Sequence, residues 1–412
     1  MNNHNVKDDD ALEAADAEWR AIIEKLMPMG RNLVAQLQDP HDRQLRYELY
    51  RNTFSAIATG YLALANTSSD YPEFIPFCGI HQLNLLGPNP DWVYSMCPID
   101  DTGTYRLYGY LGNAFRTMVQ FGSGSFVTEG NGESIGRTLV NYTVDEFPVD
   151  PDGAFSVIIS AERPRDYSGE WRELPRGATY VVQRSFGIEW INQEQPLLND
   201  ARIAIERLDR PAEKPRENAD ELRTALEGIS RWAQTYVSMS MQWAHRFRDL
   251  GTNALHLIDF AEDGGMPTQA YFEGQWEMAE DEAIIVETAI PEEYEYWSLH
   301  LLDENWSALD YYRRKTHINH ASASVTNDHK FLAVISPVDP GIQNWLDSMG
   351  YLRGLLQVRW HSASHYPKPE LKVVKQSELA GYLGNAGKPV TSESRTEDLR
   401  RTNISFQLRR RW

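Results

Sequence analysis

The chain has 412 residues, which is more than one hydrophobic core usually organises, so its length predicts two or three domains. Hydrophobic residues make up 42% and charged residues 24% of the sequence, a globular composition that excludes wholesale disorder, collagen-like repeats and coiled coils. The formal charge of -19 would repel phosphate backbones and anionic lipids. We therefore expect neither nucleic acid nor a membrane surface as a partner.

The two cysteines, Cys78 and Cys97, cannot build a disulfide framework or a four-thiolate zinc site. The first thirty or so residues contain no basic segment followed by an apolar run, and no apolar run reaches transmembrane length. These features predict a cytoplasmic protein with reduced thiols.

Residues 1–70 are predicted to be helical, because apolar residues recur at three- and four-residue intervals, most clearly from Leu45 to Ala65. In residues 71–192 the pattern changes to short apolar and aromatic runs separated by turn pairs such as Asp152-Gly153. That pattern is typical of an antiparallel β domain.

Residues 193–252 return to helical spacing and are predicted to form a connector. Residues 253–376 are predicted to form a second β domain, followed by a polar tail over residues 377–412. Strands of the second domain are expected at Ala283 to Ala289, Tyr294 to Leu302 and Phe331 to Ser336. The tail ends in a basic run, which we expect either to dock on the acidic protein or a sister subunit, or to remain solvated.

The two β domains repeat each other in sequence. The shared order is a turn, a strand ending in Ser, a Trp, an Arg-Gly pair and a strand ending in Arg. These positions are Asp152, Ser160, Trp171, Arg176-Gly177 and Arg184 in the first domain, and Asp328, Ser336, Trp345, Arg353-Gly354 and Arg359 in the second. Chance similarity of turns and strands is the alternative, but the shared Trp and Arg favour duplication. The predicted fold is mainly β with α segments, built from two antiparallel β-sandwich or jelly-roll domains.

Two stretches resemble known families. The segment Asn89 to Ser95 resembles the Asn-x-Asp-Thr-x-Tyr-Ser signature of the domain of unknown function 1254, with Pro90 and Trp92 replacing the usual Asn and Thr. Matches to the domain of unknown function 1214 are Tyr296-Trp297-Ser298, Asp339-Pro340-Gly341, Asn344-Trp345-Leu346-Asp347, Gly350, Arg353-Gly354 and Arg359-Trp360. The resemblance covers about residues 45 to 375 and implies two β-sandwich domains joined by helices. It implies almost no chemistry.

Asn89, Asp91 and Tyr94 lie where a loop enters a strand and could form an acid/base set in a cleft. Asp91 would serve as general base, its pKa raised by desolvation among aromatic residues, and Tyr94 as acid. The alternative is an Asx-turn in which Asn89 and Asp91 bond nearby backbone amides.

Arg184 and Arg359 end equivalent strands of the repeat. Facing an interdomain cleft, paired guanidinium groups could hold an anionic substrate. Alternatively, each pairs with a carboxylate of its own domain. Their presence in both repeats favours this structural interpretation, since a single asymmetric site needs only one copy.

Trp92, Trp297 and Trp306 are candidates for the walls of an apolar pocket, and Asn344 could contribute an amide. Trp345 could belong to the same wall, but because Trp171 occupies the matching place in the first repeat, a role in the core explains it better.

Several of the 11 histidines lie between His300 and His365. His317-x-x-His320 and His361-x-x-x-His365 could form an imidazole cluster of the kind found in metal-binding jelly rolls. Only His361 and His365 have the even spacing of one strand face, and no carboxylate stands at a diagnostic offset. We therefore expect solvated loop histidines and no bound metal.

The leading hypothesis is an enzyme of hydrolase or lyase type that needs no cofactor and acts on a hydrophobic, ring-containing small molecule between the sandwiches. Its catalytic residues would be Asp91, Tyr94 and Arg359. Its substrate-binding residues would be Asn89, Trp92, Arg184, Trp297, Trp306 and Asn344. The alternatives are a non-catalytic binding protein for a carbohydrate or lipid-like ligand and a metal-dependent jelly-roll enzyme. A homodimer is compatible with the sequence.

Overall fold

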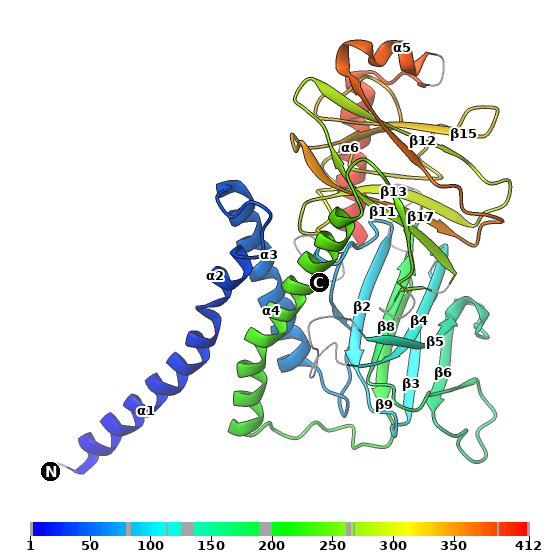
Figure 1. Ribbon diagram of the computed structural model, residues 1–412. Helices are drawn as coiled ribbons and strands as arrows, with labels where there is room; N and C mark the ends of the chain where they lie inside the picture. The colour runs from blue at the N-terminus through cyan, green and yellow to red at the C-terminus, as the bar shows by residue number, and fades with distance from the viewer. Residues whose placement is uncertain are drawn as a thin grey trace.

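Two β-sandwich domains are stacked on one another, with the N-terminal helices and the long helix Ala219–Asp249 along one side (Figure 1). The computed structural model describes residues 3–79, 84–112, 114–124, 136–188, 200–260, 265–266, 268–384 and 387–409. The fold is mainly β, as the sequence predicts.

The first domain contains two sheets, with strand orders β1-β2-β8-β4-β5 and β7-β6-β3-β9. The strands are β1 (Ile75–Pro76), β2 (Trp92–Pro98), β3 (Tyr105–Tyr110), β4 (Arg116–Ser123), β5 (Arg137–Thr143), β6 (Ala154–Ser160), β7 (Trp171–Glu173), β8 (Tyr180–Phe186) and β9 (Arg202–Arg207). Alternation produces the two faces: in β3, Tyr105 and Leu107 are buried while Arg106 and Tyr108 are exposed.

The second domain repeats this topology, with strand orders β10-β11-β17-β13-β14 and β16-β15-β12-β18. The strands are β10 (His256–Ile258), β11 (Gln269–Glu277), β12 (Glu282–Ala289), β13 (Tyr296–Leu302), β14 (His317–Asn319), β15 (Lys330–Ser336), β16 (Trp345–Asp347), β17 (Arg353–His361) and β18 (Glu370–Lys375). Each domain includes one parallel pair, β6 with β7 and β15 with β16.

An equivalent contact also recurs in the two domains. The indole Nε1 of Trp171 donates to Ser160 Oγ at 3.0 Å, and that of Trp345 donates to Ser336 Oγ at 3.1 Å. The matching strand order and this matching contact agree with the duplication inferred from the sequence. They also give Trp345 a structural role.

Each sandwich has its own hydrophobic core, and a further core lies where the domains meet. That core joins Trp92 and Tyr94 of the first domain, Tyr271 and Tyr296 of the second, and Trp243 of the long helix. Because side chains of both five-stranded sheets contribute to it, the domain interface is apolar over much of its area.

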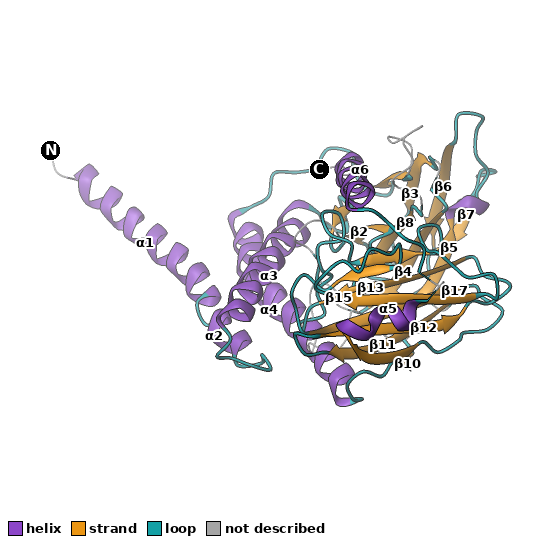
Figure 2. Ribbon diagram, turned by 90° about the horizontal axis from the view of Figure 1, so that it is seen from above, coloured by secondary structure: helices purple, strands orange, loops and turns teal. Residues whose placement is uncertain are grey.

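The helices are α1 (Asn3–Leu26), α2 (Met29–Val34), α3 (Arg43–Tyr61), α4 (Ala219–Asp249), α5 (Leu379–Leu383) and α6 (Ser392–Arg409). Asp42 caps α3 by accepting from Gln44 N at 2.7 Å, and a π-helical turn, Leu62–Asn66, extends it, which confirms the predicted helix over residues 45–65. The α1 helix projects away from the body (Figures 1 and 2). Among the described residues, no helix has both the length and the apolar character needed to cross a membrane.

The connector predicted to be helical over residues 193–252 is only partly so. Its part from Ala219 is α4, which begins with a capping box of Asn218 and Glu221. Strand β9 pairs with β3 instead of forming helix, and Ile205 is buried on one face of that strand. Residues 193–199 lie outside the described part of the chain.

Candidate functional site

A cavity of about 90 Å³ lies at the interdomain core, between the two five-stranded sheets and α4. This is several times the room that one water molecule needs. Much of its wall is aromatic, formed by Phe77, Trp92, Trp243, Phe260 and Trp306. Tyr94, Arg184, Gln269, Tyr271, Gln357 and Arg359 add polar groups. We call this space the interdomain cavity.

The structure brings many of the predicted site residues to this cavity. Trp92, Tyr94, Arg184, Trp306 and Arg359 all line it. The sequence analysis missed Tyr271 and Gln357, which lie on the second domain's side. Aligning the two repeats strand by strand would have identified Tyr271, because it occupies the position in β11 that Tyr94 occupies in β2.

The two domains contribute equivalent Tyr-Arg pairs. Tyr94 of β2 is the cross-strand partner of Arg184 in β8, and Tyr271 of β11 is the partner of Arg359 in β17. Both pairs line the same cavity. The structural interpretation of the arginines rested on a single asymmetric site, which needs only one copy. Because both copies line the same cavity, one site can use both arginines.

Each arginine is also bonded by a residue at an equivalent place in the neighbouring strand. Arg184 Nη1 donates to Gln120 Oε1 of β4, and Arg359 Nη1 lies 3.2 Å from His300 Nδ1 of β13. Burial, reinforced by the charge of Arg359, lowers the pKa of His300 well below its usual value. His300 is therefore a neutral imidazole whose Nδ1 can accept from the guanidinium.

Arg359 is only 4% exposed. Within the described residues, no carboxylate oxygen lies within the 4.0 Å ion-pair distance of its guanidinium. Burial raises the pKa of the nearby Glu273 well above its usual range, against the opposing effect of Arg359, so the neutral carboxyl is favoured there. Burial of a cation without an anionic partner costs free energy, so Arg359 is the residue of the cavity that most strongly indicates an anionic ligand.

Gly87 fixes two walls of the cavity. Its carbonyl accepts from Arg359 Nη2, and its N–H donates to Trp306 O at 3.0 Å. Its φ is +55°, and a Cβ at this position would lie 2.7 Å from the Trp306 indole. Only glycine fits both the backbone conformation and the close approach.

The phenols of Tyr94 and Tyr271 are hydrogen-bond donors. Burial raises the pKa of both groups above its usual value. Tyr94 Oη accepts from Asn89 N at 3.0 Å and Tyr271 Oη accepts from Met266 N at 3.4 Å. Across the described residues neither O–H has an acceptor, so both can donate to a ligand.

Asp91 does not line the cavity. Its carboxylate accepts from Tyr296 Oη at 2.6 Å and from Asn319 Nδ2 at 3.0 Å, and lies 3.0 Å from His317 Nε2. Burial acts to raise the pKa of Asp91, but His317 and these hydrogen bonds lower it below its usual value. The predicted raised pKa is therefore wrong, because three side chains of the second domain stabilise the charged form.

The turn at Asn89 is confirmed. Asn89 Oδ1 accepts from Asp91 N at 3.0 Å, the geometry of an Asx-turn, and Asn89 Nδ2 donates to Tyr296 Oη at 2.9 Å. Asn89 and Asp91 thus bind the second domain beside the cavity, which makes them links between the domains.

Two other predicted binding residues lie elsewhere. Trp297 is fully buried inside the second sandwich against Phe331 and Trp360, because side chains alternate along β13 and its neighbour Tyr296 faces the interdomain core. Asn344 Nδ2 donates to Ser324 O and Leu332 O at 2.6 and 2.9 Å, which joins the segment at Ser324 to strand β15.

The histidines of the described ranges do not gather as a metal site would require. Strand β17 ends at His361, so His365 lies in the following loop and the two do not share a strand face. Over the described ranges there is no group of three or more His, Cys, Asp or Glu residues placed to hold a metal ion.

Comparison with known proteins supports the fold alone. No protein-family model matches the chain, and no curated protein matches it. The crystal structure of an uncharacterised protein from Burkholderia cenocepacia superposes with a TM-score of 0.78 at 22% identity, covering 89% of this chain and 99% of that one. The VPA0106 protein from Vibrio parahaemolyticus matches with a TM-score of 0.45 at 13% identity, covering 80% and 98%. This chain therefore shares its fold with the Burkholderia protein.

Proposed function

We propose that the interdomain cavity binds a small organic anion with an apolar or ring-containing body. The anionic group would contact Arg359 and Arg184, and the body would lie against Trp92 and Trp306. The observation that carries the proposal is the buried Arg359 guanidinium, which has no carboxylate within ion-pair distance in the described part of the chain. An anionic ligand would supply the missing charge.

The direct test is a binding screen with matched acids and amides. We expect benzoate and cyclohexanecarboxylate to raise the melting temperature and benzamide to have no effect, because a ligand that binds only the native state stabilises it. Arg359→Gln should weaken carboxylate binding by about 10- to 100-fold, the value of a hydrogen bond to a charged group. Arg106→Gln, an exposed residue paired with Glu206, is the control. Equal binding by the Arg359→Gln variant would overturn the proposal.

Catalysis on the bound anion is a second candidate function, favoured by the two phenols beside Arg359. Asp91 is not part of this scheme, since its carboxylate is bonded to Tyr296 and Asn319. Chemically unchanged ligand after long incubation with the protein would favour binding alone. A product whose formation Tyr94→Phe abolishes would favour catalysis.

The resemblance to the domains of unknown function 1254 and 1214 and a cytoplasmic location stay predictions. The first is supported by the motifs around Asn89 and Asn344. Cell fractionation of the expressed full chain tests the second.

A further inference from the structure

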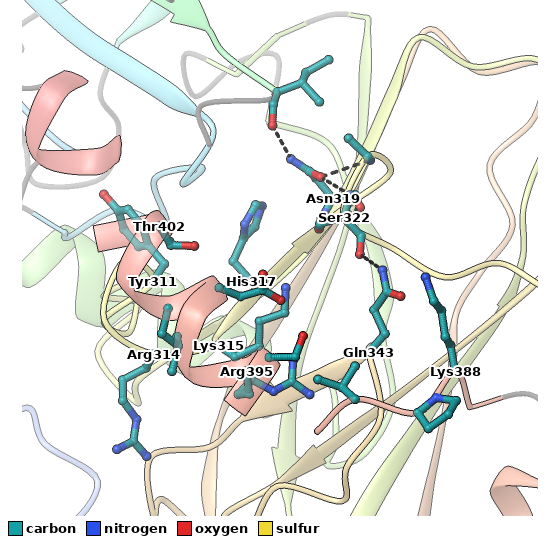
Figure 3. A pocket seen from close by; sticks show the side chains of 17 residues that line it. Tyr311, Arg314, Lys315, His317, Asn319, Ser322, Gln343, Lys388, Arg395 and Thr402 are labelled. Atoms are coloured by element: carbon teal, nitrogen blue, oxygen red, sulfur yellow. Dashed lines mark hydrogen bonds between the residues drawn. The ribbon is translucent and has the colours of Figure 1, made fainter. Parts of the chain in front are cut away.

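A second, larger pocket opens between β14 and the C-terminal helix α6 (Figure 3). Its volume of about 530 Å³ is within the range of small-molecule sites. Its walls combine the β14 region, the loop around Gln343, the segment around Lys388 and α6. We call it the α6 pocket.

Several basic side chains lie in the walls of the α6 pocket. Arg314, Lys315, His317, Lys388 and Arg395 line it, and Asp398 is the acidic lining residue. This concentration of positive charge stands out in a chain with a formal charge of -19. A cationic pocket on an acidic protein attracts anions selectively.

Some of these charges are already neutralised. Arg314 Nε lies 2.6 Å from Asp347 Oδ2, Arg395 Nε lies 2.9 Å from Asp339 Oδ2, and Asp398 pairs with Arg401. Lys315 and Lys388 differ, because in the described ranges neither ammonium has an ion pair or a hydrogen bond. Two lysine charges therefore remain available to a ligand.

Lys315 is partly buried in the wall of this pocket. The loss of solvent lowers the pKa of its ammonium to about 8, and the charge of Arg395 adds to the effect, while Asp398 and Asp91 oppose it. His317 lies two residues along the chain with its Nε2 3.0 Å from Asp91 Oδ2. An anion in the α6 pocket would supply a countercharge for the buried Lys315 ammonium.

We propose that the α6 pocket binds a small molecule carrying a phosphate group, with the ammonium groups of Lys315 and Lys388 as its principal contacts. Lysine binds phosphate as a point charge, and its three ammonium hydrogens can each donate to a phosphate oxygen. The pocket exceeds the size of phosphate itself, so the ligand is an organic phosphate whose body occupies the rest.

Bound phosphate would also hold α6 in place. Ser394, Arg395 and Thr402 of α6 line the pocket, and Arg409 at the end of the helix is bonded to Asp200 of the first domain. Occupancy is therefore expected to slow hydrogen exchange along α6, which gives a readout independent of affinity.

The test is a calorimetric titration of the full chain with inorganic phosphate. We expect saturable binding that weakens at least tenfold in Lys315→Gln and in Lys388→Gln. Lys330→Gln and Lys375→Gln, which remove exposed lysines paired with carboxylates of the same domain, should leave it unchanged. Because Lys388 is exposed, the Lys388→Gln variant stays informative even if Lys315→Gln fails to fold.

The pH dependence identifies Lys315. Inorganic phosphate is mostly dianionic from about pH 8, whereas the protonated fraction of an ammonium with a pKa of about 8 falls from about a half at pH 8 to about a tenth at pH 9. Affinity should therefore fall about fivefold over this range in the wild type and stay nearly flat in Lys315→Gln. No saturable binding, or binding that is lost in Arg359→Gln but kept in both lysine variants, would overturn the proposal.

Discussion

Arg184 and Arg359 occupy equivalent positions of the two domains and line one cavity. Duplication has produced a near-symmetric site, in which each domain supplies a tyrosine, an arginine and a neighbouring residue that bonds the arginine. The arginines nevertheless differ, since Arg184 is bonded to the Gln120 amide and Arg359 contacts a neutral imidazole and a carbonyl.

Replacing Arg359 and Arg409 by methionine should give unequal losses of stability. Arg409 Nη2 and Nε each lie 2.9 Å from Asp200, and both side chains are buried, so Arg409→Met leaves a buried carboxylate behind and should cost about 3–5 kcal/mol. Arg359→Met leaves no described carboxylate unpaired and should cost less. Urea denaturation of both variants measures the difference. An equal or larger loss in Arg359→Met would make Arg359 a structural residue.

Gly87→Ala should damage the interdomain cavity. The new Cβ would lie 2.7 Å from the Trp306 indole, so the indole or the Gly87 backbone must move, and with it the contact to Arg359. The matched control is Gly177→Ala, which has a φ of +81° but nothing within 4 Å of the new Cβ. Both variants carry the strain of a positive φ, about 1 kcal/mol. The thermal-shift response to carboxylates should be lost only in Gly87→Ala. An equal response in both variants would mean that the clash does not reach the cavity.

Asp303 should make the protein less stable as the pH rises. Burial raises the pKa of this carboxyl to about 7, from 3.8, although Ser307 N and Asn305 N donate to it. The protonated carboxyl favours the folded state. This stabilisation is fully present below the unfolded pKa of 3.8 and is lost as the pH rises through the folded pKa of about 7. Asp303→Asn removes this dependence and should stabilise the protein by up to about 4 kcal/mol at pH 8. Denaturation of the wild type and of Asp303→Asn at pH 5 and pH 8 measures the two free energies of unfolding. If the difference between the two proteins is no larger at pH 8 than at pH 5, the prediction is wrong.

Asp91→Asn should have the opposite pH dependence. The pKa of Asp91 is lowered in the folded state, so the carboxylate stabilises the protein above its unfolded pKa near 4, and this contribution disappears as the pH falls. At pH 7 we expect the variant to lose about 2–3 kcal/mol, because hydrogen bonds to a charged acceptor are replaced by bonds to a neutral amide. Stability curves that stay parallel down to pH 3 would show that the charge of Asp91 contributes nothing.

Local periodicity predicts much of the fold. The alternating strands and the helix after Asp42 follow from patterns a few residues long. The order of residues in the repeat includes the Ser and the Trp, and the structure adds the contact between them. The strand Arg202–Arg207 escaped prediction because it is a short segment whose pairing partner, Tyr105–Tyr110, lies far away in the sequence. Its Ile-x-Ile alternation was the available signal.

The site is less predictable, because its residues meet across the domain interface. Asn89, Asp91 and Tyr94 are neighbours in the sequence, but their side chains have different partners in the structure. Tyr94 lines the cavity, whereas Asp91 is bonded to Tyr296 and Asn319, more than two hundred residues away in the chain. No local pattern reveals such partners. The same holds for the α6 pocket, since Lys315 lies just before β14 inside the second sandwich and Lys388 lies beyond the last strand of that sandwich.

The bonds of Asp91 also constrain how a ligand can enter. Tyr296 and Asn319 of the second domain bond its carboxylate, and Arg409 of α6 donates to its carbonyl at 3.0 Å, so three segments are joined at one residue of the first domain. A hinge that separated the sandwiches would have to break all of these buried bonds together. Exchange of a molecule in the interdomain cavity is therefore expected to proceed without separation of the sandwiches, and the two sandwiches should unfold in a single cooperative transition.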